Sequence, residues 1–379
     1  MSKNFDYTAI ARRFYARFPV LTYVSIQINF WVVANILLGV IMHLNALSIS
    51  QTFISAEPGR LAPIIIVAII FGILYGTGLG LTDYYLDKTI FRKQPLGKII
   101  LIKTVMSLGV LILLLLFLRF VLFDLLISPS AYIADFTLSH TSWKYLFYIG
   151  VIYYFFMTLV INFINQVNRK YGPGILIPLL LGKYRNPREE ERIFMFMDLK
   201  SSTSLAEKLG HLKYSSFIRD SFMDINLVLL PFNAEVYQYV GDQIVVTWRV
   251  SDGLKDFSCI NFFFACEKQF LDRAHHYTKQ YGFLPHFKAG LHMGKVTVVE
   301  IGDIKRDIAY HGDTLNTAAR IQSVCNEYNR KFLISEFLLE KIDLNPNLRM
   351  ESLGMIQLKG KTTMVGIASV DLLEKDSQP

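Results

Sequence analysis

The sequence predicts an α+β protein in two parts, with four apolar helices first and a sheet domain after them. Two observations support this prediction. Hydrophobic residues make up 52% of the 379 residues, which is too high for an ordinary soluble protein. From residue 193 onward the composition changes, and short β-rich runs alternate with amphipathic helical patterns. A membrane part and a soluble part are therefore expected.

Four apolar segments are long enough to cross a membrane, since a hydrocarbon core of ~30 Å takes about 20 apolar residues in a helix. These segments are 22–47, 62–85, 98–127 and 143–165. The expected organisation is an N-terminal segment at 1–21, a transmembrane domain at 22–166, a linker at 167–187, a sheet domain at 188–373 and a tail at 374–379.

Basic residues indicate how the four spans are oriented. Lysines and arginines gather before span one, between spans two and three, and after span four. Cytoplasmic flanks are rich in these residues, so both termini of a multi-pass protein of the inner (plasma) membrane are expected in the cytoplasm. This distribution accounts for much of the net charge of +8, and nucleic acid is not an expected partner.

Several residues inside the spans are unusual for a lipid environment. Gly72, Gly76 and Gly80 share one helix face, which predicts close helix packing, although glycine is also simply common in membrane helices. Lys103 and Arg119 lie near opposite ends of span three, and we expect them to reach the two interfaces. The alternative is that such polar groups line a ligand site.

Two segments flank the transmembrane domain. The pattern of apolar and basic residues at 4–18 is typical of an interfacial helix, with a disordered tail as the alternative. After span four, a Gly-Pro-Gly sequence at 172–174 precedes an apolar run at 175–181. That run is too short to cross a bilayer, so it lies on the membrane, packs on the sheet domain or pairs with its twin in a dimer.

The sheet domain begins with two acidic residues at strand ends. An apolar run at 193–197 ends at Asp198 and leads through a polar turn into a helical pattern. The runs 234–240 and 243–248 flank Gly241–Asp242, which predicts a hairpin with a carboxylate at its tip. Aspartate is common in turns, so the pair alone is weak evidence for a metal site. The later elements are expected to be a helix at 259–281, strands at 286–292 and 295–301, a helix at 314–328 and a hairpin at 355–370.

Four motifs in order carry a family resemblance: FMDLKSST from Phe196, YVGDQIVVTW from Tyr239, HGDTLNTAAR from His311 and LKGK from Leu358. Over residues 188–373 they resemble the class III adenylate and guanylate cyclase catalytic domain. The resemblance implies a ferredoxin-like βαββαβ core and a head-to-tail homodimer with active sites at the interface. We also expect the transmembrane helices to pair in that dimer.

The same resemblance assigns roles to individual residues. Asp198 and Asp242 would bind two Mg²⁺ ions, or Mn²⁺ in their place, with the carbonyl of Leu199 as a further ligand. From the partner chain, Asn316 would orient the ribose and Arg320 would neutralise charge on the α-phosphate.

Other assignments are less specific. Lys359 would hold the outer phosphates, and Thr203 would contact phosphate unless Ser201, Ser202 or Thr203 instead caps the helix. Ser201 and Ser202 replace the Gly-Phe that the family usually has after the first metal-binding aspartate.

The purine-reading positions depart from the family, which usually has Lys with Asp for adenine or Glu with Cys for guanine. Here they are Gln238 and Ala309. A glutamine amide can accept from adenine N6 and donate to N1, which favours ATP, but a rotated amide also serves guanine. The alternative is that Gln238 is an outward-facing polar residue of the strand.

The expected function is an adenylate cyclase that converts ATP into 3′,5′-cyclic AMP and pyrophosphate, regulated through its membrane domain. Alternatives are a guanylate or dual-specificity cyclase, a non-catalytic receptor or scaffold, and a four-helix transporter or channel. A diguanylate cyclase is disfavoured, because it requires GG[DE]EF where this chain has VGDQI.

Overall fold

The computed structural model describes residues 18–53, 60–89, 95–117, 140–171, 182–304, 306–342, 348–358 and 363–373. The chain divides into two compact units, Met1–Leu176 and Ile177–Pro379, here called the helical unit and the sheet unit. The predicted fold class is confirmed, because four apolar helices precede an α+β sheet domain. The segment 4–18 is largely, and the run 175–181 wholly, outside the described residues, as is Arg119.

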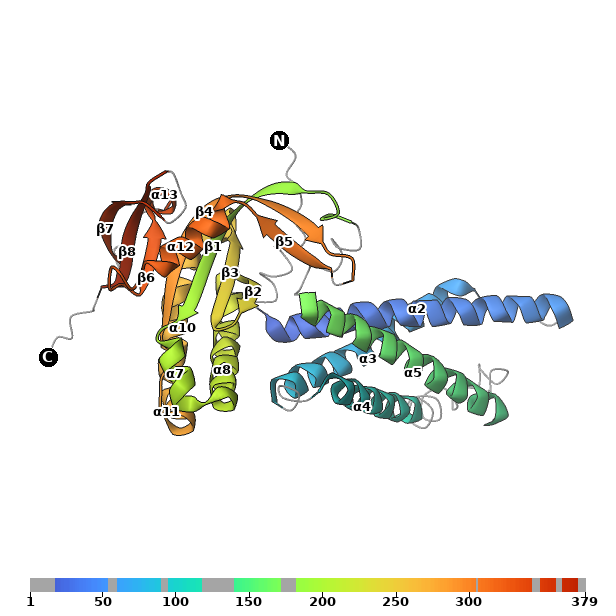
Figure 1. Cartoon of the computed structure of the whole chain (residues 1–379). Helices are drawn as coiled ribbons and strands as arrows, with labels where there is room; N and C mark the ends of the chain where they lie inside the picture. The colour runs from blue at the N-terminus through green and yellow to red at the C-terminus, as the bar shows by residue number, and fades with distance from the viewer. Residues whose placement is uncertain are drawn as a thin grey trace. The chain divides into compact units, whose positions relative to one another are not determined.

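Among the described residues, the helical unit has four long helices, which Figure 1 shows. Each is long and apolar enough to cross a membrane, with a mean hydropathy between 1.9 and 2.7 over its most apolar stretch. These helices are α2 (Pro19–Phe53), α3 (Leu61–Thr89), α4 (Leu96–Phe117) and α5 (His140–Tyr171).

The glycine seam predicted on the second span is confirmed. A Cβ atom added at Gly72, Gly76 or Gly80 of α3 would collide with the backbone of α2. Only glycine permits such an approach, because any larger side chain would push the two helices apart. The Cα atoms it would meet belong to Val32, Ile28 and Val24, at 2.6, 2.6 and 2.5 Å.

Aromatic and polar side chains fill the centre of the helical unit, and many large apolar side chains face outward. The rings of Trp31 and Tyr154 stack with their centroids 5.0 Å apart, and Tyr75 meets Trp31 edge-on at 4.5 Å. The Tyr154 hydroxyl donates to Asn35 Oδ1 at 2.5 Å. An apolar outside with a hydrogen-bonded inside suits helices surrounded by lipid.

The sheet unit is built on a βαββαβ core. Its four core strands follow the order β2-β3-β1-β4, and every neighbouring pair is antiparallel, so the ferredoxin-like prediction is confirmed. The core elements are β1 (Arg188–Leu199), α8 (His211–Leu229), β2 (Glu235–Val240), β3 (Gln243–Arg249), α10 (Ser258–Asp272) and β4 (Phe287–Ile301).

Further elements extend this core. The strand β6 pairs with β4 in parallel, β8 and β7 follow it, and β5 pairs with the end of β4. These elements are α7 (Ser202–Leu209), η4 (Leu230–Phe232), α9 (Val250–Leu254), η5 (Lys255–Phe257), α11 (Ala274–Tyr281), β5 (Asp307–His311), α12 (Asp313–Ser323), β6 (Phe332–Ser335), α13 (Glu336–Leu339), β7 (Leu348–Ile356) and β8 (Val365–Leu372).

The two faces of the sheet are covered differently. Ile193, Met195 and Met197 of β1 pack in the large core with α8 and α10. Phe194 and Phe196 point to the opposite face, because side chains alternate along a strand. That second face packs against α12 but leaves Phe196 partly exposed. The even-numbered residue Asp198 therefore lies on the less covered face.

Several predicted element boundaries are wrong. The helix expected at 314–328 already ends at Ser323. The strands expected at 286–292 and 295–301 form one continuous strand, β4. Gly294 does not break it, since the glycine instead makes room for Thr314, whose Oγ1 would lie 2.5 Å from an added Cβ. The helix expected at 259–281 is divided at Arg273, which has non-helical angles of φ −105° and ψ 16°.

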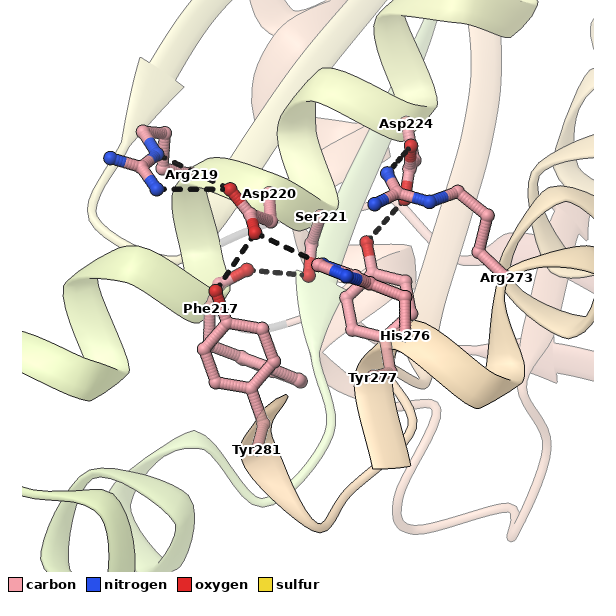
Figure 2. A network of polar contacts seen from close by, with 9 residues as sticks. All are labelled: Phe217, Arg219, Asp220, Ser221, Asp224, Arg273, His276, Tyr277 and Tyr281. Carbon is pink, nitrogen blue, oxygen red and sulfur yellow. Dashed lines mark hydrogen bonds and ion pairs between the residues drawn. The ribbon is translucent and has the colours of Figure 1, made fainter. Parts of the chain in front are cut away.

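A buried polar network holds α8 against α11 (Figure 2). Asp224 is fully buried and accepts hydrogen bonds from the Tyr277 hydroxyl and Arg273 Nη1, each at 2.5 Å. Asp220 accepts from the Tyr281 hydroxyl at 2.8 Å. Burial alone would raise the pKa of Asp220, but its hydrogen-bond donors outweigh that effect and lower it. The other donors to Asp220 are His276 and Arg219.

Candidate active site

The sheet brings the two predicted metal-binding acids together. Asp198 lies one residue before the end of β1 and is paired with Gln243, the residue that follows Asp242. Asp242 stands in the two-residue turn between β2 and β3, where Gly241 adopts a left-handed φ of +61°. Glycine adopts this conformation without strain, so the turn is tight and its carboxylate stays beside the end of β1.

The environment of Asp198 disfavours its negative charge. Burial raises the pKa of this carboxyl group, and the charge of Asp242 raises it further. Lys288, which lies opposite Asp198 on β4, and Gln322 act in the other direction but do not cancel the increase. The hydrogen bond from Gln322 Nε2 to Asp198 Oδ2 is long, at 3.4 Å. A cation placed between the two acids would relieve their repulsion.

The available donor atoms fit a hard divalent cation. Within the described part of the chain, no group of three His, Cys, Asp or Glu residues is arranged to hold a metal. The two carboxylates and the backbone carbonyl of Leu199, the last residue of β1, supply oxygen atoms only. Mg²⁺ is commonly bound by one or two carboxylates together with water and substrate phosphates. The residues present therefore fit Mg²⁺ or Mn²⁺.

A pocket of about 330 Å³ lies next to Asp242. Tyr214, Ser215 and Ile218 of α8 line it together with the Gly241–Asp242 turn. Burial, and then the charge of Asp242, raise the pKa of the Tyr214 hydroxyl, which is hydrogen-bonded to Ser202. Sequence reasoning missed Tyr214, because a tyrosine on an amphipathic helix gives no local sign of what it faces.

The segment after β1 turns directly into α7. Ser201 has a left-handed φ of +59° at the helix start, and no side chain caps the helix there, so the N-cap alternative for Ser201 is wrong. Left-handed backbone is costly for a residue with a Cβ atom, which explains why glycine suits this position. Thr203 lies in the first turn and is exposed, where its hydroxyl is accessible to an incoming phosphate.

Asn316 and Arg320 are on α12 but point away from the sheet. The helix buries Thr317, Ala318 and Ile321 against β4 and β1, whereas Asn316 is exposed and Arg320 partly exposed. At about 100° per residue, Asn316 and Arg320 lie on the opposite side of the helix from Ala318. Neither side chain bonds to another residue that the structure describes. One chain therefore does not bring them to its own Asp198.

The remaining candidates are the two purine-reading positions and the phosphate-binding lysine. Gln238 is exposed on β2, directly after a bulge at Tyr237, and Ala309 is buried on β5 opposite Val299. Their neighbours Tyr237 and Tyr310 are in ring contact, with centroids 5.0 Å apart, so the two strands approach each other. Lys359 lies outside the described residues.

The sheet unit also matches a known family. Residues 185–368 fit the family model described as the Adenylate and Guanylate cyclase catalytic domain. Together with the fold and the motif residues, this match shows that the sheet unit belongs to the class III adenylate and guanylate cyclase family, as the sequence motifs predicted.

Two curated relatives align with this part of the chain. Adenylate cyclase 2 of Rhizobium meliloti (strain 1021) is 37% identical over 210 residues, which cover 55% of this chain and 58% of that protein. The adenylate cyclase of Anabaena cylindrica is 25% identical over 183 residues, or 46% of this chain and 36% of that one. The chain thus spans less than two thirds of either relative. The crystal structure of the adenylyl cyclase CyaB from P. aeruginosa covers 51% of this chain and 100% of its own, with 18% identity and a TM-score of 0.42.

Proposed function

We propose that this protein is an adenylate cyclase that converts ATP into 3′,5′-cyclic AMP and pyrophosphate. The observation that carries the proposal is the pair Asp198 and Asp242 at one sheet edge, where the pKa of Asp198 is raised by burial and by the charge of Asp242. The family match and the names of two relatives support the reaction class. Gln238 favours adenine through its amide, and guanylate or dual-specificity cyclase activity is the alternative.

The reaction joins two atoms of one nucleotide. The ribose 3′-oxygen attacks the α-phosphorus and loses its proton, while the bond from the α-phosphorus to the bridging oxygen breaks and pyrophosphate leaves. Divalent cations held by Asp198 and Asp242 would acidify the 3′-hydroxyl and neutralise charge on the phosphates. Thr203, in the first turn of α7, would donate a hydrogen bond to a phosphate oxygen.

The active unit in this proposal is a homodimer. Asn316 and Arg320 point away from their own Asp198, so a second copy must supply them. In the site so formed, Asn316 would orient the ribose, and Arg320 would stabilise the charge that develops on the α-phosphate. Lys359 of the LKGK motif would bind the outer phosphates. The incompletely covered sheet face that carries Phe196 and Asp198 offers a surface for this pairing.

The helical unit is proposed to anchor the enzyme in the plasma membrane. Its four apolar helices suit a lipid environment, and the basic flanks support an orientation with both termini in the cytoplasm. Because α5 is the last described helix before the sheet unit, a movement of α5 is a direct way to alter how two sheet units dock. Regulation through the helical unit follows from that connection.

The first test is nucleotide turnover by the purified full-length protein in lipid nanodiscs. ATP and GTP are supplied separately with Mg²⁺ or Mn²⁺, and both cyclic nucleotides are measured. Cyclic AMP is expected from the wild type, none from Asp242→Ala, and normal amounts from the matched control Asp272→Ala, which removes an exposed carboxylate. Cyclic GMP as the main product would reverse the purine assignment, and no product from either nucleotide would contradict the proposal.

A second test addresses the shared site. Arg320→Ala alone is expected to lower the rate by about 10²–10³. Co-expressed with Asp242→Ala, it should recover about a quarter of wild-type activity, because half of the dimers are mixed and each mixed dimer keeps one intact site of two. A mixture as inactive as the separate variants would show that each site is formed within one chain.

A further inference from the structure

The helical unit contains a small, partly open cavity of about 20 Å³. All four helices contribute polar side chains to its wall, which is unusual for a segment surrounded by lipid, where buried polar groups are costly. These side chains are Gln27 of α2, Asp83 of α3, Lys103 and Ser107 of α4, and Thr158 and Asn162 of α5.

One wall of the cavity is an ion pair. Lys103 Nζ lies 2.9 Å from Asp83 Oδ1, and the two side chains are 6% and 13% exposed. Gln27 Nε2 donates to Asp83 Oδ2 at 2.6 Å, and Gln27 Oε1 accepts from Trp31 Nε1 at 3.2 Å. The prediction that Lys103 reaches the membrane interface is therefore wrong, because a carboxylate on the neighbouring helix binds its ammonium group. This wall carries no net charge.

The lining of the cavity also contains a hydrogen-bond donor that has no acceptor among the described residues. The hydroxyl groups of Ser107 and Thr158 are hydrogen-bonded at 3.0 Å. Asn162 is 6% exposed, and its buried Nδ2 has no hydrogen-bond partner in the described part of the chain. A buried N–H without an acceptor costs about 1–3 kcal/mol. An acceptor in the adjoining cavity would remove that cost.

The size and charge of the cavity restrict what it can hold. A water molecule needs roughly 10–15 Å³ of cavity, so about 20 Å³ accommodates one. A second ion is disfavoured, because Lys103 already neutralises Asp83 and any added charge would be buried without a counter-charge. The free group is the N–H donor of Asn162, so the occupant must accept a hydrogen bond. A single water molecule meets these three conditions.

The cavity lies near one end of the four helices. Asn162 is five residues, or about 8 Å of helix, before Val167, the last residue of the apolar stretch of α5. Gln27 follows the start of the first stretch, Val20, by seven residues, or about 10 Å. The cavity is thus at the end of the bundle where α5 leaves toward the sheet unit.

We propose that this cavity is a regulatory binding site for one water molecule, which bridges Asn162 of α5 to the Asp83–Lys103 ion pair. The bound water ties α5 to α3 and α4, so losing it frees the last turns of α5. The proposal that water binds is supported by the cavity itself. The proposed effect of the water on catalysis rests on the proposed cyclase function.

Water in the cavity can be detected by radiolytic labelling of the full-length protein in nanodiscs, since a buried side chain beside bound water is oxidised and a dry one is not. Trp31 lines the cavity and is 1% exposed, and Trp248 of the sheet unit, 0% exposed, is an internal dry reference. Trp31 is expected to be labelled several-fold faster than Trp248. Equal labelling in the wild type would overturn the proposal.

Two variants test the role of the water. Asn162→Leu removes the donor and fills the space, and Thr158→Val removes one hydroxyl with little change of shape. Both are expected to slow labelling of Trp31 and to change the rate of cyclic AMP formation several-fold. The matched control Asn29→Leu makes the same exchange at an exposed position of α2 and should change neither.

The two readouts separate the proposals. Labelling lost in Asn162→Leu supports the water site even if the wild type makes no cyclic nucleotide, in which case only the proposed function fails. If Asn162→Leu behaves like Asn29→Leu in labelling, the water site is wrong. If labelling falls but cyclic AMP formation by an active enzyme is unchanged, the regulatory role is wrong.

Discussion

The two units differ in how completely the polar groups around their buried carboxylates are hydrogen-bonded. In the sheet unit, each oxygen of Asp220 and Asp224 has a hydrogen-bond donor among the side chains of Figure 2. In the helical unit, Asp83 is equally well bound, but Asn162 beside it keeps an unused N–H and faces a cavity. A saturated network leaves no place for a ligand, so it can only hold elements together.

This difference indicates that the network in the sheet unit has a structural role, whereas the network in the helical unit has a regulatory one. The saturated network fixes α8, the helix that presents Tyr214, Ser215 and Ile218 to the pocket beside Asp242. The role of this network is to keep the wall of the pocket in position, and its hydrogen bonds do not need to break for that role. The incomplete network at the exit of α5 has a second state available, with or without its occupant, and a second state is what regulation requires.

The largest effect is expected from Asp83→Leu. The substitution removes the carboxylate that binds the buried Lys103 ammonium, and removing one partner of a buried ion pair should cost about 3–5 kcal/mol of unfolding free energy. The double variant Asp83→Leu/Lys103→Leu removes both charges and should recover most of the loss. Denaturant titration of the full-length protein in detergent measures both, and equal losses in the two variants would show that the ion pair is not what stabilises this region.

Asp224→Ala is expected to cost less, about 2–3 kcal/mol. Arg273 is 30% exposed and can turn to water once its partner is gone, whereas the Tyr277 hydroxyl stays buried without an acceptor. Tyr277→Phe, which leaves Asp224 with one donor, should cost about 1 kcal/mol. Pulse proteolysis of the full chain reports on the sheet unit. A larger loss of unfolding free energy in Asp224→Ala than in Asp83→Leu would contradict this comparison of the two units.

A smaller effect concerns pH. Because hydrogen-bond donors lower the pKa of Asp220 in the folded protein, its stabilising contribution is complete above the ordinary aspartate pKa of about 3.9 and disappears as the pH falls through the lower folded value. Relative to Asp220→Asn, the wild type should be more stable by about 1 kcal/mol at pH 7. Unfolding midpoints from pH 7 to pH 3 measure the difference, which should shrink toward the acid end. A constant difference would contradict the role of the ionised carboxylate.

The sequence predicted the parts of the site that stand in continuous motifs. Asp198 could be placed because it lies at the end of a recognisable strand, and Asp242 because it stands in a recognisable hairpin turn. The ferredoxin-like core followed from the resemblance. The glycine seam could also be predicted, because three glycines at a spacing of four share one helix face. Local patterns of this kind need no knowledge of which elements are neighbours.

Contacts between distant segments could not be predicted in this way. Gln322 reaches Asp198 across 124 residues of chain, and Lys288 lies beside it only through the register of β1 and β4. The partner of Lys103 is on another helix, and a lysine near the end of a span normally extends to the interface. The gap expected between the strands at 286–292 and 295–301 is absent from β4, because the close approach of Thr314 to Gly294 leaves no mark in the sequence.

The contact of α3 with α2 at Gly72, Gly76 and Gly80 has a mechanical consequence. Backbone meets backbone there, so no side chain at these positions can change rotamer and absorb a displacement. The helices α2 and α3 should therefore move together as one rigid body. Within the described helices, relative movement is then expected mainly where α4 and α5 pack against this pair, and the water-sized cavity at Asn162 lies at that contact.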